Sequence, residues 1–233
     1  MTVPQAASEV DLPVSTVYRF IRELSRFGLV VEIGEGLYAL GPRLVHLGGP
    51  ATLYAQLRHV LHPVLHELST ETGETALATV RSGLMALTLI QVTSENPIHL
   101  SFQEGSVRPL YAGASATALF AYQPELLVRQ VIREGLPPSL SEPQVRQRLE
   151  LIRERGYSLS TGEVDRDATA IGVPVRIDGS AVCAISIAGP TSRLQPRLLE
   201  LAPMVVEAGD RAERSLFDDT NWPTLSEISE NGE

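Results

Sequence analysis

The stretch Asp11–Leu40, DLPVSTVYRFIRELSRFGLVVEIGEGLYAL, decides the fold of the amino-terminal part of this chain. Its first half carries apolar residues at helical spacing, which places four of them on one face: Val14, Val17, Ile21 and Leu24. Pro13 suits the first turn of such a helix, and Gly28 ends it because glycine adopts the left-handed conformation at low cost. Two short strands follow, Leu29–Ile33 and Gly36–Leu40, joined by a Gly-Glu-Gly turn. The sequence therefore predicts a helix, a stop and a β-hairpin, in that order.

The other face of this helix carries short hydroxyls and arginines, which suit contacts with DNA. Ser15 and Thr16 at its start can reach phosphates or base edges. Arg19 can form a bidentate contact with a guanine edge or a phosphate, and Arg22 can reach the DNA backbone. An ordinary amphipathic surface helix with solvated arginines has the same periodicity, so the pattern alone leaves both interpretations open.

This segment closely resembles the winged helix-turn-helix of the IclR family of bacterial transcription regulators. The match runs without a gap from Leu12 to Gly48 and covers Leu12-Pro13, Ser15-Thr16-Val17-Tyr18-Arg19, Leu24, Gly28-Leu29-Val30, Tyr38, Leu40-Gly41-Pro42-Arg43-Leu44 and Leu47-Gly48. The resemblance implies that double-stranded operator DNA is a partner. The DNA-binding residues that it implies are Pro13, Ser15, Thr16, Tyr18, Arg19, Arg22, Arg26 and Gly36.

The amino-acid composition limits the domain organisation, the compartment and the partners that this chain can have. The 233 residues are enough for a small and a medium domain, and a hydrophobic content of 43% supports a core. No apolar run reaches membrane-spanning length, and the start of the chain shows no secretory signal pattern. The single cysteine, Cys183, rules out an internal disulfide, which suits a reducing cytoplasm. The net charge of −9 argues against non-specific nucleic-acid binding by the whole surface. We therefore expect a cytoplasmic protein without a membrane partner.

The order of these patterns predicts four parts. They are a winged helix-turn-helix at 1–49, a linker and dimerisation helix at 50–68, an effector-binding domain at 69–215 and a disordered acidic tail at 216–233. Within the first part, residues 2–10 form the positioning helix. An IclR-type winged helix has another helix upstream, and this sequence begins too late to contain it, so three apolar residues should lose their cover: Val10, Val17 and Ile21. We expect a weakened or partly disordered DNA-binding domain.

Residues 51–68 have the pattern of a second amphipathic helix, which Pro63 should kink or break. Three histidines at spacings of three and four residues could share one face of it: His59, His62 and His66. A metal site is one interpretation of these histidines, and solvent-exposed residues near a proline are the other. We favour the second, because neither an HExxH pattern nor a fourth ligand accompanies them. No metal and no other cofactor is expected.

Residues 71–209 alternate between strand and helix patterns, as in an α/β domain. The expected strands are 75–80, 85–92, 99–102, 107–110, 158–161, 170–177 and 181–188. The expected helices are 115–122, 125–134, 144–155 and 194–214. Asp178-Gly179, between two strand patterns, is a strong hairpin signal, and a second turn is expected at residues 81–83.

This part also resembles the IclR family, in its effector-binding domain. The matching landmarks are Gly105, Pro109, Ala112, Ala118-Leu119, Ala121, Arg155-Gly156-Tyr157-Ser158, Gly162-Glu163, Ala170-Ile171, Pro174-Val175, Ala184-Ile185-Ser186-Ile187, Gly189-Pro190 and Arg193. The resemblance implies an α+β fold with a GAF-like effector domain, in which a curved antiparallel sheet has helices on one face and a small-molecule pocket on the other. It also implies a homodimer or a homotetramer.

By the same resemblance, the ligand site lies where the loop before the 115–122 helix faces the Gly162-Glu163 loop and the last hairpin. The residues implied there are Leu110, Ala112, Gly113, Ala114, Ser115, Ser160, Thr161, Glu163, Ala170, Cys183 and Ser186. The helix start around Gly113–Ser115 offers unpaired backbone N–H groups, which suit a carboxylate. Close packing of a strand on a helix needs the same small side chains, so both interpretations remain open. Asp167 replaces a glycine common in the family and could repel an anionic ligand or hydrogen-bond a hydroxyl-bearing one.

These expectations combine into a ligand-responsive, sequence-specific transcription regulator, a repressor or an activator, that senses an organic acid or an aromatic compound. A stand-alone small-molecule sensor with a degenerate winged helix is the alternative. An enzyme is disfavoured, because the sequence has no GxSxG, P-loop or GxGxxG motif. Cys183 also lies in a hydrophobic strand pattern without a histidine nearby in the sequence.

Overall fold

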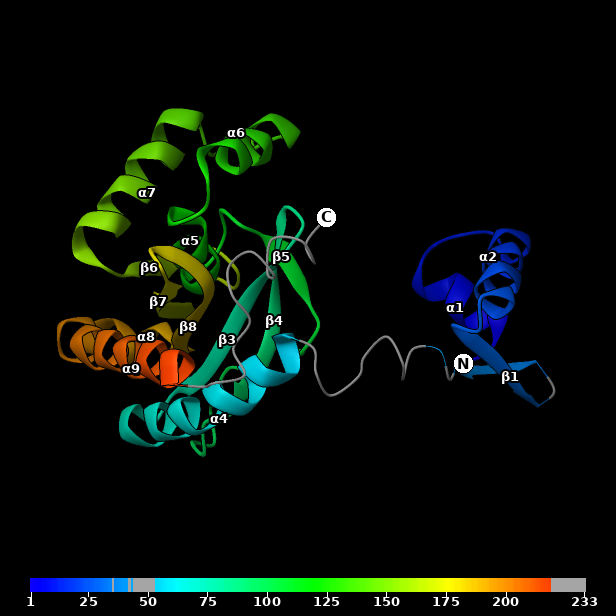
Figure 1. Ribbon diagram of the computed structural model, residues 1–233, viewed down its shortest axis with the longest axis horizontal. Helices are drawn as coiled ribbons and strands as arrows, with labels where there is room; N and C mark the ends of the chain where they lie inside the picture. The colour runs from blue at the N-terminus through cyan, green and yellow to red at the C-terminus, as the bar shows by residue number, and fades with distance from the viewer. Residues whose placement is uncertain (35, 42, 44–52, 219–233) are drawn as a thin grey trace. The chain divides into compact units, whose positions relative to one another are not determined.

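The computed structural model describes residues 1–34, 36–41, 43 and 53–218 (Figure 1). The chain divides into two compact units, Met1–Thr52 and Leu53–Glu233. The predicted acidic tail from residue 219 onwards and the start of the predicted linker helix at 50–52 lie outside the described residues. No helix in the described ranges is both long enough and apolar enough to cross a membrane.

The described residues of the amino-terminal unit include the helices α1 and α2 and a hairpin. Its elements are α1 (Val3–Glu9), α2 (Val14–Arg26), β1 (Val30–Gly34) and β2 (Leu37–Leu40), and the two strands pair antiparallel. Gly28 after α2 and Gly36 before β2 adopt φ angles of 68° and 76°, which explains glycine at both positions. The predicted helix, stop and hairpin are therefore confirmed.

The core of this unit joins α1 to α2 through three buried residues, Val3, Ala7 and Val17. Only 6% of Val17 is exposed, so the expectation that it would lose its cover is wrong, because residues of α1 pack on it. Ile21 is half-buried, whereas Val10 is 57% exposed, as expected. The apolar face of α2 is thus covered in part within this unit.

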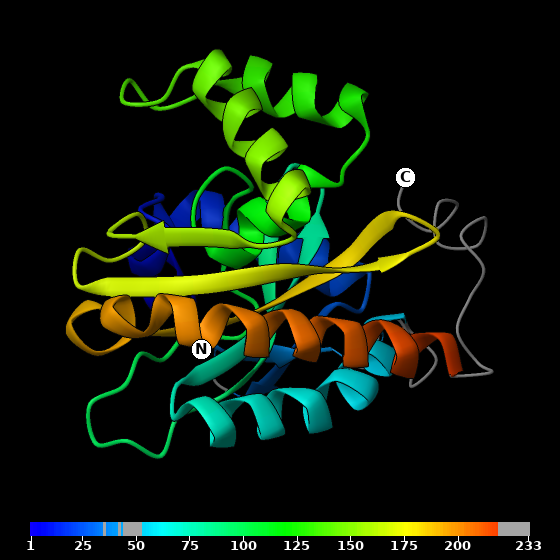
Figure 2. The same cartoon turned by 90° about the vertical axis from the view of Figure 1, so that its left-hand side faces the viewer.

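The carboxyl-terminal unit is built on a curved antiparallel sheet, in which the described strands follow the order β5-β4-β3-β8-β7-β6 (Figure 2). Its strands are β3 (Thr75–Ser82), β4 (Met85–Val92), β5 (Val107–Pro109), β6 (Ser158–Thr161), β7 (Ala168–Ile177) and β8 (Ser180–Pro190). Its helices are α4 (Leu53–Thr72), α5 (Ala114–Ala121), α6 (Glu125–Glu134), α7 (Glu142–Arg155), α8 (Thr191–Leu194) and α9 (Leu198–Asp218), with a 3-10 turn at Gln195–Arg197. The expected α+β fold is confirmed.

Helices cover both faces of this sheet. α4 and α9 lie side by side across one face (Figures 1 and 2), where they bury alternate strand residues such as Ile171, Ile185 and Ile187. α5 packs against β7 and β8, and α7 packs on α5. The expectation of helices on one face and a pocket on the other holds for α4 and α9, whereas α5 shares the pocket face.

Two tight hairpins set the register of the long strands. Ile177 pairs with Ser180 across Asp178 and Gly179, whose φ angles of 50° and 82° are typical of a type I′ turn. The turn between β3 and β4 contains Gly83 at a φ of 58°. Both hairpins agree with their sequence signals.

Three elements differ from the predictions. α4 continues through Pro63, because this proline lies on the exposed side and removes only one backbone hydrogen bond. Residues 99–102, predicted as a strand, form a loop. α9 begins at Leu198 and continues to Asp218, so the first residues of the predicted tail are helical. They are helical because Leu216 is fully buried in the core of the sheet.

Candidate functional site

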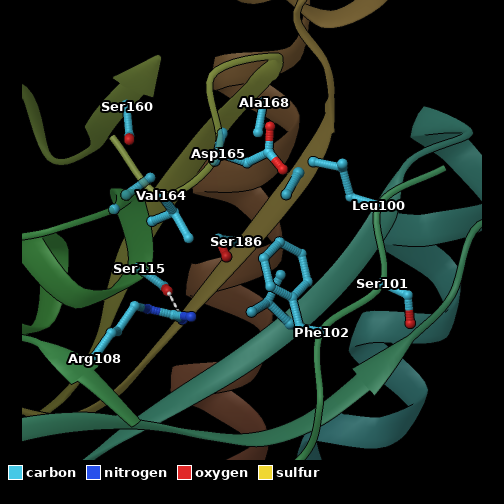
Figure 3. Close-up of a pocket in the computed structure, with 15 residues that line it drawn as sticks. Leu100, Ser101, Phe102, Arg108, Ser115, Ser160, Val164, Asp165, Ala168 and Ser186 are labelled. Atoms are coloured by element: carbon cyan, nitrogen blue, oxygen red, sulfur yellow. Dashed lines mark hydrogen bonds between the residues drawn. The ribbon is translucent and has the colours of Figure 1, made fainter. Parts of the chain in front are cut away.

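A cavity of about 230 Å³ lies on the α5 face of the sheet (Figure 3). It is enclosed by the sheet, the first turn of α5, the loop between β6 and β7, and the segment between β4 and β5. Its walls are formed by Leu77, Leu100, Ser101, Phe102, Arg108, Gly113, Ala114, Ser115, Ser160, Val164, Asp165, Ala168, Ala170, Ser186 and Ala188. Ligand pockets usually have volumes of roughly 300–1,000 Å³, so this cavity suits a small molecule.

The two-residue period of the strands decides which side chains reach the cavity. Ser186 and Ala188 of β8 line it, whereas Ile185 and Ile187 lie in the opposite core. Ala170 of β7 lines the cavity in the same way. The space exists because β7 and β8 present small side chains on this face and large ones on the other.

Arg108 of β5 places a guanidinium at one wall of the cavity. Its Nη2 donates to the hydroxyls of Thr79 and Ser115, each at 3.1 Å, and its Nη1 donates to that of Thr88 at 3.4 Å. Its Cζ lies 6.0 Å from the centroid of the Phe102 ring. Its Nε is buried without a hydrogen-bond partner among the described residues.

Burial lowers the pKa of Arg108, and no carboxylate among the described residues opposes this shift. The guanidinium remains protonated at physiological pH, because the ordinary pKa of arginine is above 12. One wall of the cavity therefore carries a largely buried positive charge whose hydrogen-bond partners are neutral hydroxyls.

The start of α5 is already occupied by a carboxylate of this chain. The N–H of Gly113 donates to Glu163 Oε2 at 2.9 Å, and Arg148 Nη2 lies 2.8 Å from Glu163 Oε1. The N–H of Gly113, expected to be free for a ligand carboxylate, is therefore taken. The same contacts tie the β6–β7 loop to α5 and α7, which fixes one rim of the cavity.

Six of the residues expected at the ligand site line the cavity: Gly113, Ala114, Ser115, Ser160, Ala170 and Ser186. The other five do not. Leu110 is fully buried in the core between α5 and α7, because it precedes the turn into α5. Ala112 is half-buried outside the lining. Thr161 and Glu163 are exposed, since they lie where β6 leaves the sheet.

Cys183, the fifth of these, lies on the opposite face of the sheet. It precedes Ser186 by three residues, so the strand period places its side chain in the core that α4 and α9 cover. Burial raises the pKa of its thiol far above the ordinary value. A buried, protonated thiol is unreactive, and Cys183 is a core residue.

No sequence pattern singles out the charged residues of this cavity. A lone arginine in a short strand, such as Arg108, is usually a solvent-facing residue. The acidic residue in the lining is Asp165, whereas Asp167, expected to face a ligand, lies outside the lining; both residues are exposed. The β6–β7 loop reverses direction between the two residues, and a sequence cannot show which of its acids faces inward.

Side-chain hydrogen bonds hold the segment that carries Leu100 and Phe102. The side chain of Gln91 accepts from the Phe102 N–H at 2.9 Å and donates to Ser101 Oγ at 3.2 Å. Thr75 Oγ1 donates to the carbonyl of Leu100 at 2.6 Å. These bonds take the place of a strand ladder, which explains why the alternating apolar residues here form a wall of the cavity rather than a strand.

The residues expected to bind DNA lie on α2 and the hairpin. Ser15, Tyr18, Arg19, Arg22 and Arg26 are exposed, Thr16 and Gly36 are half-buried, and Pro13 is the N-cap of α2. Arg26 lies 3.7 Å from the carboxylate of Glu23. Within the described ranges, no hydrogen bond or ion pair engages the side chains of Arg19 and Arg22, so both guanidinium groups are available to phosphates.

The three histidines of α4 are exposed, and the rings of His62 and His66 stack with centroids 6.5 Å apart. No group of three or more His, Cys, Asp or Glu side chains among the described residues has an arrangement that could hold a metal ion. His59 belongs to the same exposed side of the helix.

Comparison with known proteins places the chain in a family. The family described as bacterial transcriptional regulator IclR C-terminal matches residues 51–213. The chain is 26% identical over 224 residues to the transcriptional regulator KipR of Bacillus subtilis, covering 93% of this chain and 90% of that protein. It is 30% identical over 201 residues to the transcriptional repressor AllR of Salmonella paratyphi A, covering 83% and 74%.

Solved structures share this fold. A putative IclR regulator from Silicibacter sp. TM1040 superposes with a TM-score of 0.77 at 25% identity, covering 96% of this chain and 92% of that one. An IclR homolog from Microbacterium hydrocarbonoxydans, complexed with 4-hydroxybenzoate, has a TM-score of 0.76 at 24% identity, covering 93% and 91%. The relatives named above are transcriptional regulators or repressors, not enzymes. The family match spans most of the chain, and the chain therefore belongs to the IclR family of bacterial transcription regulators.

Proposed function

We propose that this chain is an operator-binding regulator whose carboxyl-terminal unit senses a small organic acid, held by Arg108. The observation that carries this proposal is a largely buried guanidinium in a cavity wall, with hydroxyl groups as its only polar partners among the described residues. A buried charge without a counter-ion costs free energy, which an anionic ligand offsets when it binds. The planar guanidinium also matches a carboxylate in geometry.

The rest of the lining favours an acid with an apolar body. Leu100, Phe102 and Val164 surround the space beside Arg108, and several alanines form its floor. The Microbacterium structure was solved with 4-hydroxybenzoate, an aromatic acid of this kind. This cavity of about 230 Å³ has room for one ring or a short aliphatic chain, and not for a large conjugate.

Replacing Arg108 by methionine should weaken the binding of carboxylates by about 10- to 100-fold, since hydrogen bonds to charged groups contribute roughly 1.5–3 kcal/mol. Methionine keeps an apolar stem of similar length. The measurement is calorimetric titration of the wild type and the variant with a panel of small aliphatic and aromatic monocarboxylates, each paired with its neutral amide. Arg81→Met, which changes an arginine of β3 outside the cavity, is the control. Equal binding of acids and amides by the wild type would contradict the proposal.

Arg19→Ala and Arg22→Ala should each weaken binding to duplex DNA from upstream of the gene. Each lost phosphate contact should also reduce, by about one, the slope of the logarithm of the affinity against the logarithm of the salt concentration. Arg129→Ala, an exposed arginine on α6 paired with Glu125, is the control for a change in net charge. Binding of carboxylates without any binding of DNA would favour the alternative, a small-molecule sensor with a degenerate winged helix.

A further inference from the structure

Asp165 supplies a second charged group to the cavity. It lies in the loop between β6 and β7 and forms part of the lining. Its Oδ1 accepts from the backbone N–H of Asp167 at 3.0 Å, which leaves Oδ2 for another donor. No ion pair involves Asp165 within the described part of the chain.

Asp165 and Arg108 come from opposite ends of the sheet. Arg108 is on β5, the first strand in the sheet order, whereas Asp165 joins β6 to β7, the last two. Figure 3 shows the two side chains on different sides of the cavity, with the hydroxyl of Ser186 on the strand between them. No ion pair joins the two residues among those that the structure describes, so both charges are available to a ligand in the cavity.

The lining between the two charges is mostly apolar. Leu100, Phe102, Val164 and four alanines contribute side chains without hydrogen-bonding groups, and Ser160 and Ser186 contribute hydroxyls. The cavity thus has an anion-binding end, an apolar middle and an acceptor end. A molecule that fits this order has a carboxylate, an apolar body and a hydrogen-bond donor.

Resting on the organic-acid function proposed above, we infer that Asp165 determines specificity and selects acids that carry a hydroxyl or amino group opposite the carboxylate. An ionised carboxylate only accepts hydrogen bonds, so it accepts from a hydroxyl and repels a second carboxylate. Because Asp165 is exposed, solvent screens this contact. The discrimination by this residue is therefore about three- to tenfold in affinity.

A matched ligand series tests this inference by calorimetric titration. The probes are benzoate, 3- and 4-hydroxybenzoate, 4-methoxybenzoate and terephthalate. In the wild type, the better hydroxybenzoate should bind about three- to tenfold tighter than benzoate, and terephthalate should bind worst. The methoxy compound, which has no donor, should gain nothing over benzoate. Asp165→Ala should reduce the advantage of the hydroxyl to about one, whereas Asp167→Ala, an acid of the same loop outside the lining, should preserve it.

Asp165→Asn is the control for a change in the structure of the β6–β7 loop, because its amide oxygen can still accept from the Asp167 N–H. Without the negative charge and with an amide donor, it should bind terephthalate better than the wild type does. Benzoate binding that depends on Arg108, without any advantage of the hydroxyl, would overturn this inference and leave the organic-acid function standing. The inference would also fail if the advantage persisted in Asp165→Ala. Failure of every carboxylate to bind, or binding that Arg108→Met does not change, would overturn the organic-acid function itself.

Discussion

Replacing Glu74 by alanine should lower the free energy of unfolding of the carboxyl-terminal unit by about 3 kcal/mol, the lower end of the range for breaking a buried ion pair. Only 1% of the Glu74 side chain is exposed, and its two oxygens accept from Arg193 at 2.6 and 2.7 Å. Arg193 also donates to the carbonyl of Ile98 at 3.0 Å. The expected loss lies at the lower end because Arg193 is 31% exposed and can turn towards water. For a unit of this size, Tm should fall by roughly 6–12 °C.

Glu200→Ala is the matched control, since Glu200 forms a similar pair with Arg197 at 2.7 Å but is 59% exposed. It should leave the free energy of unfolding almost unchanged. The double variant Glu74→Met/Arg193→Met should recover part of the stability lost in Glu74→Ala, because it leaves no unpaired charge behind. Denaturant titration followed by circular dichroism measures all three. Equal losses in Glu74→Ala and Glu200→Ala would mean that burial does not strengthen the Glu74–Arg193 pair.

The elements predicted from sequence alone are those whose signals are local. Examples are the Asp178-Gly179 turn, Gly28 directly after the C-cap of α2, and the apolar periods of the long strands, each of which can be recognised within a short stretch of sequence. Residues 99–102 are a segment whose local pattern predicts the wrong structure. Their alternating pattern is typical of a strand, but Gln91 and Thr75, distant in sequence, bond this segment as a loop.

The residues of the candidate site also divide into those that the sequence predicts and those that it does not. Small residues such as Gly113, Ser115 and Ser186 follow from resemblance to the family, and they line the cavity. Arg108 and Asp165 do not follow from the sequence, because an isolated charge has no periodicity, and the partners of Arg108 come from β3 and α5, which are distant in sequence or in a different element. The same resemblance implies Cys183 beside Ser186 at the ligand, whereas the strand period puts their side chains on opposite faces of the sheet.

Gly172→Ala should weaken the binding of carboxylates by roughly tenfold and destabilise the carboxyl-terminal unit by about 2–3 kcal/mol. A Cβ at Gly172 would lie 2.6 Å from the carbonyl carbon of Ala114 and 2.7 Å from the backbone nitrogen of Ser115. These are backbone atoms of the first turn of α5, so the helix itself must move. Ser115 would then leave its positions 3.1 Å from Arg108 and 2.9 Å from Thr79, and the guanidinium would lose the contacts that orient it.

Gly209→Ala makes the same chemical change on α9, the helix that packs against the other face of β7. There a Cβ would lie 2.9 Å from Cγ2 of Val173, a buried side chain that must shift, and 3.7 Å from the Pro174 carbonyl oxygen, so no backbone atom has to move as far as in Gly172→Ala. Alanine also favours the helix by up to about 1 kcal/mol over glycine. This variant should therefore keep ligand affinity, and its loss of stability should be smaller than that of Gly172→Ala, because the helix propensity of alanine partly offsets the displaced side chain. If Gly172→Ala bound carboxylates as tightly as Gly209→Ala, the close approach of α5 to β7 would not be what positions Ser115 and Arg108, and the cavity would tolerate a displaced helix.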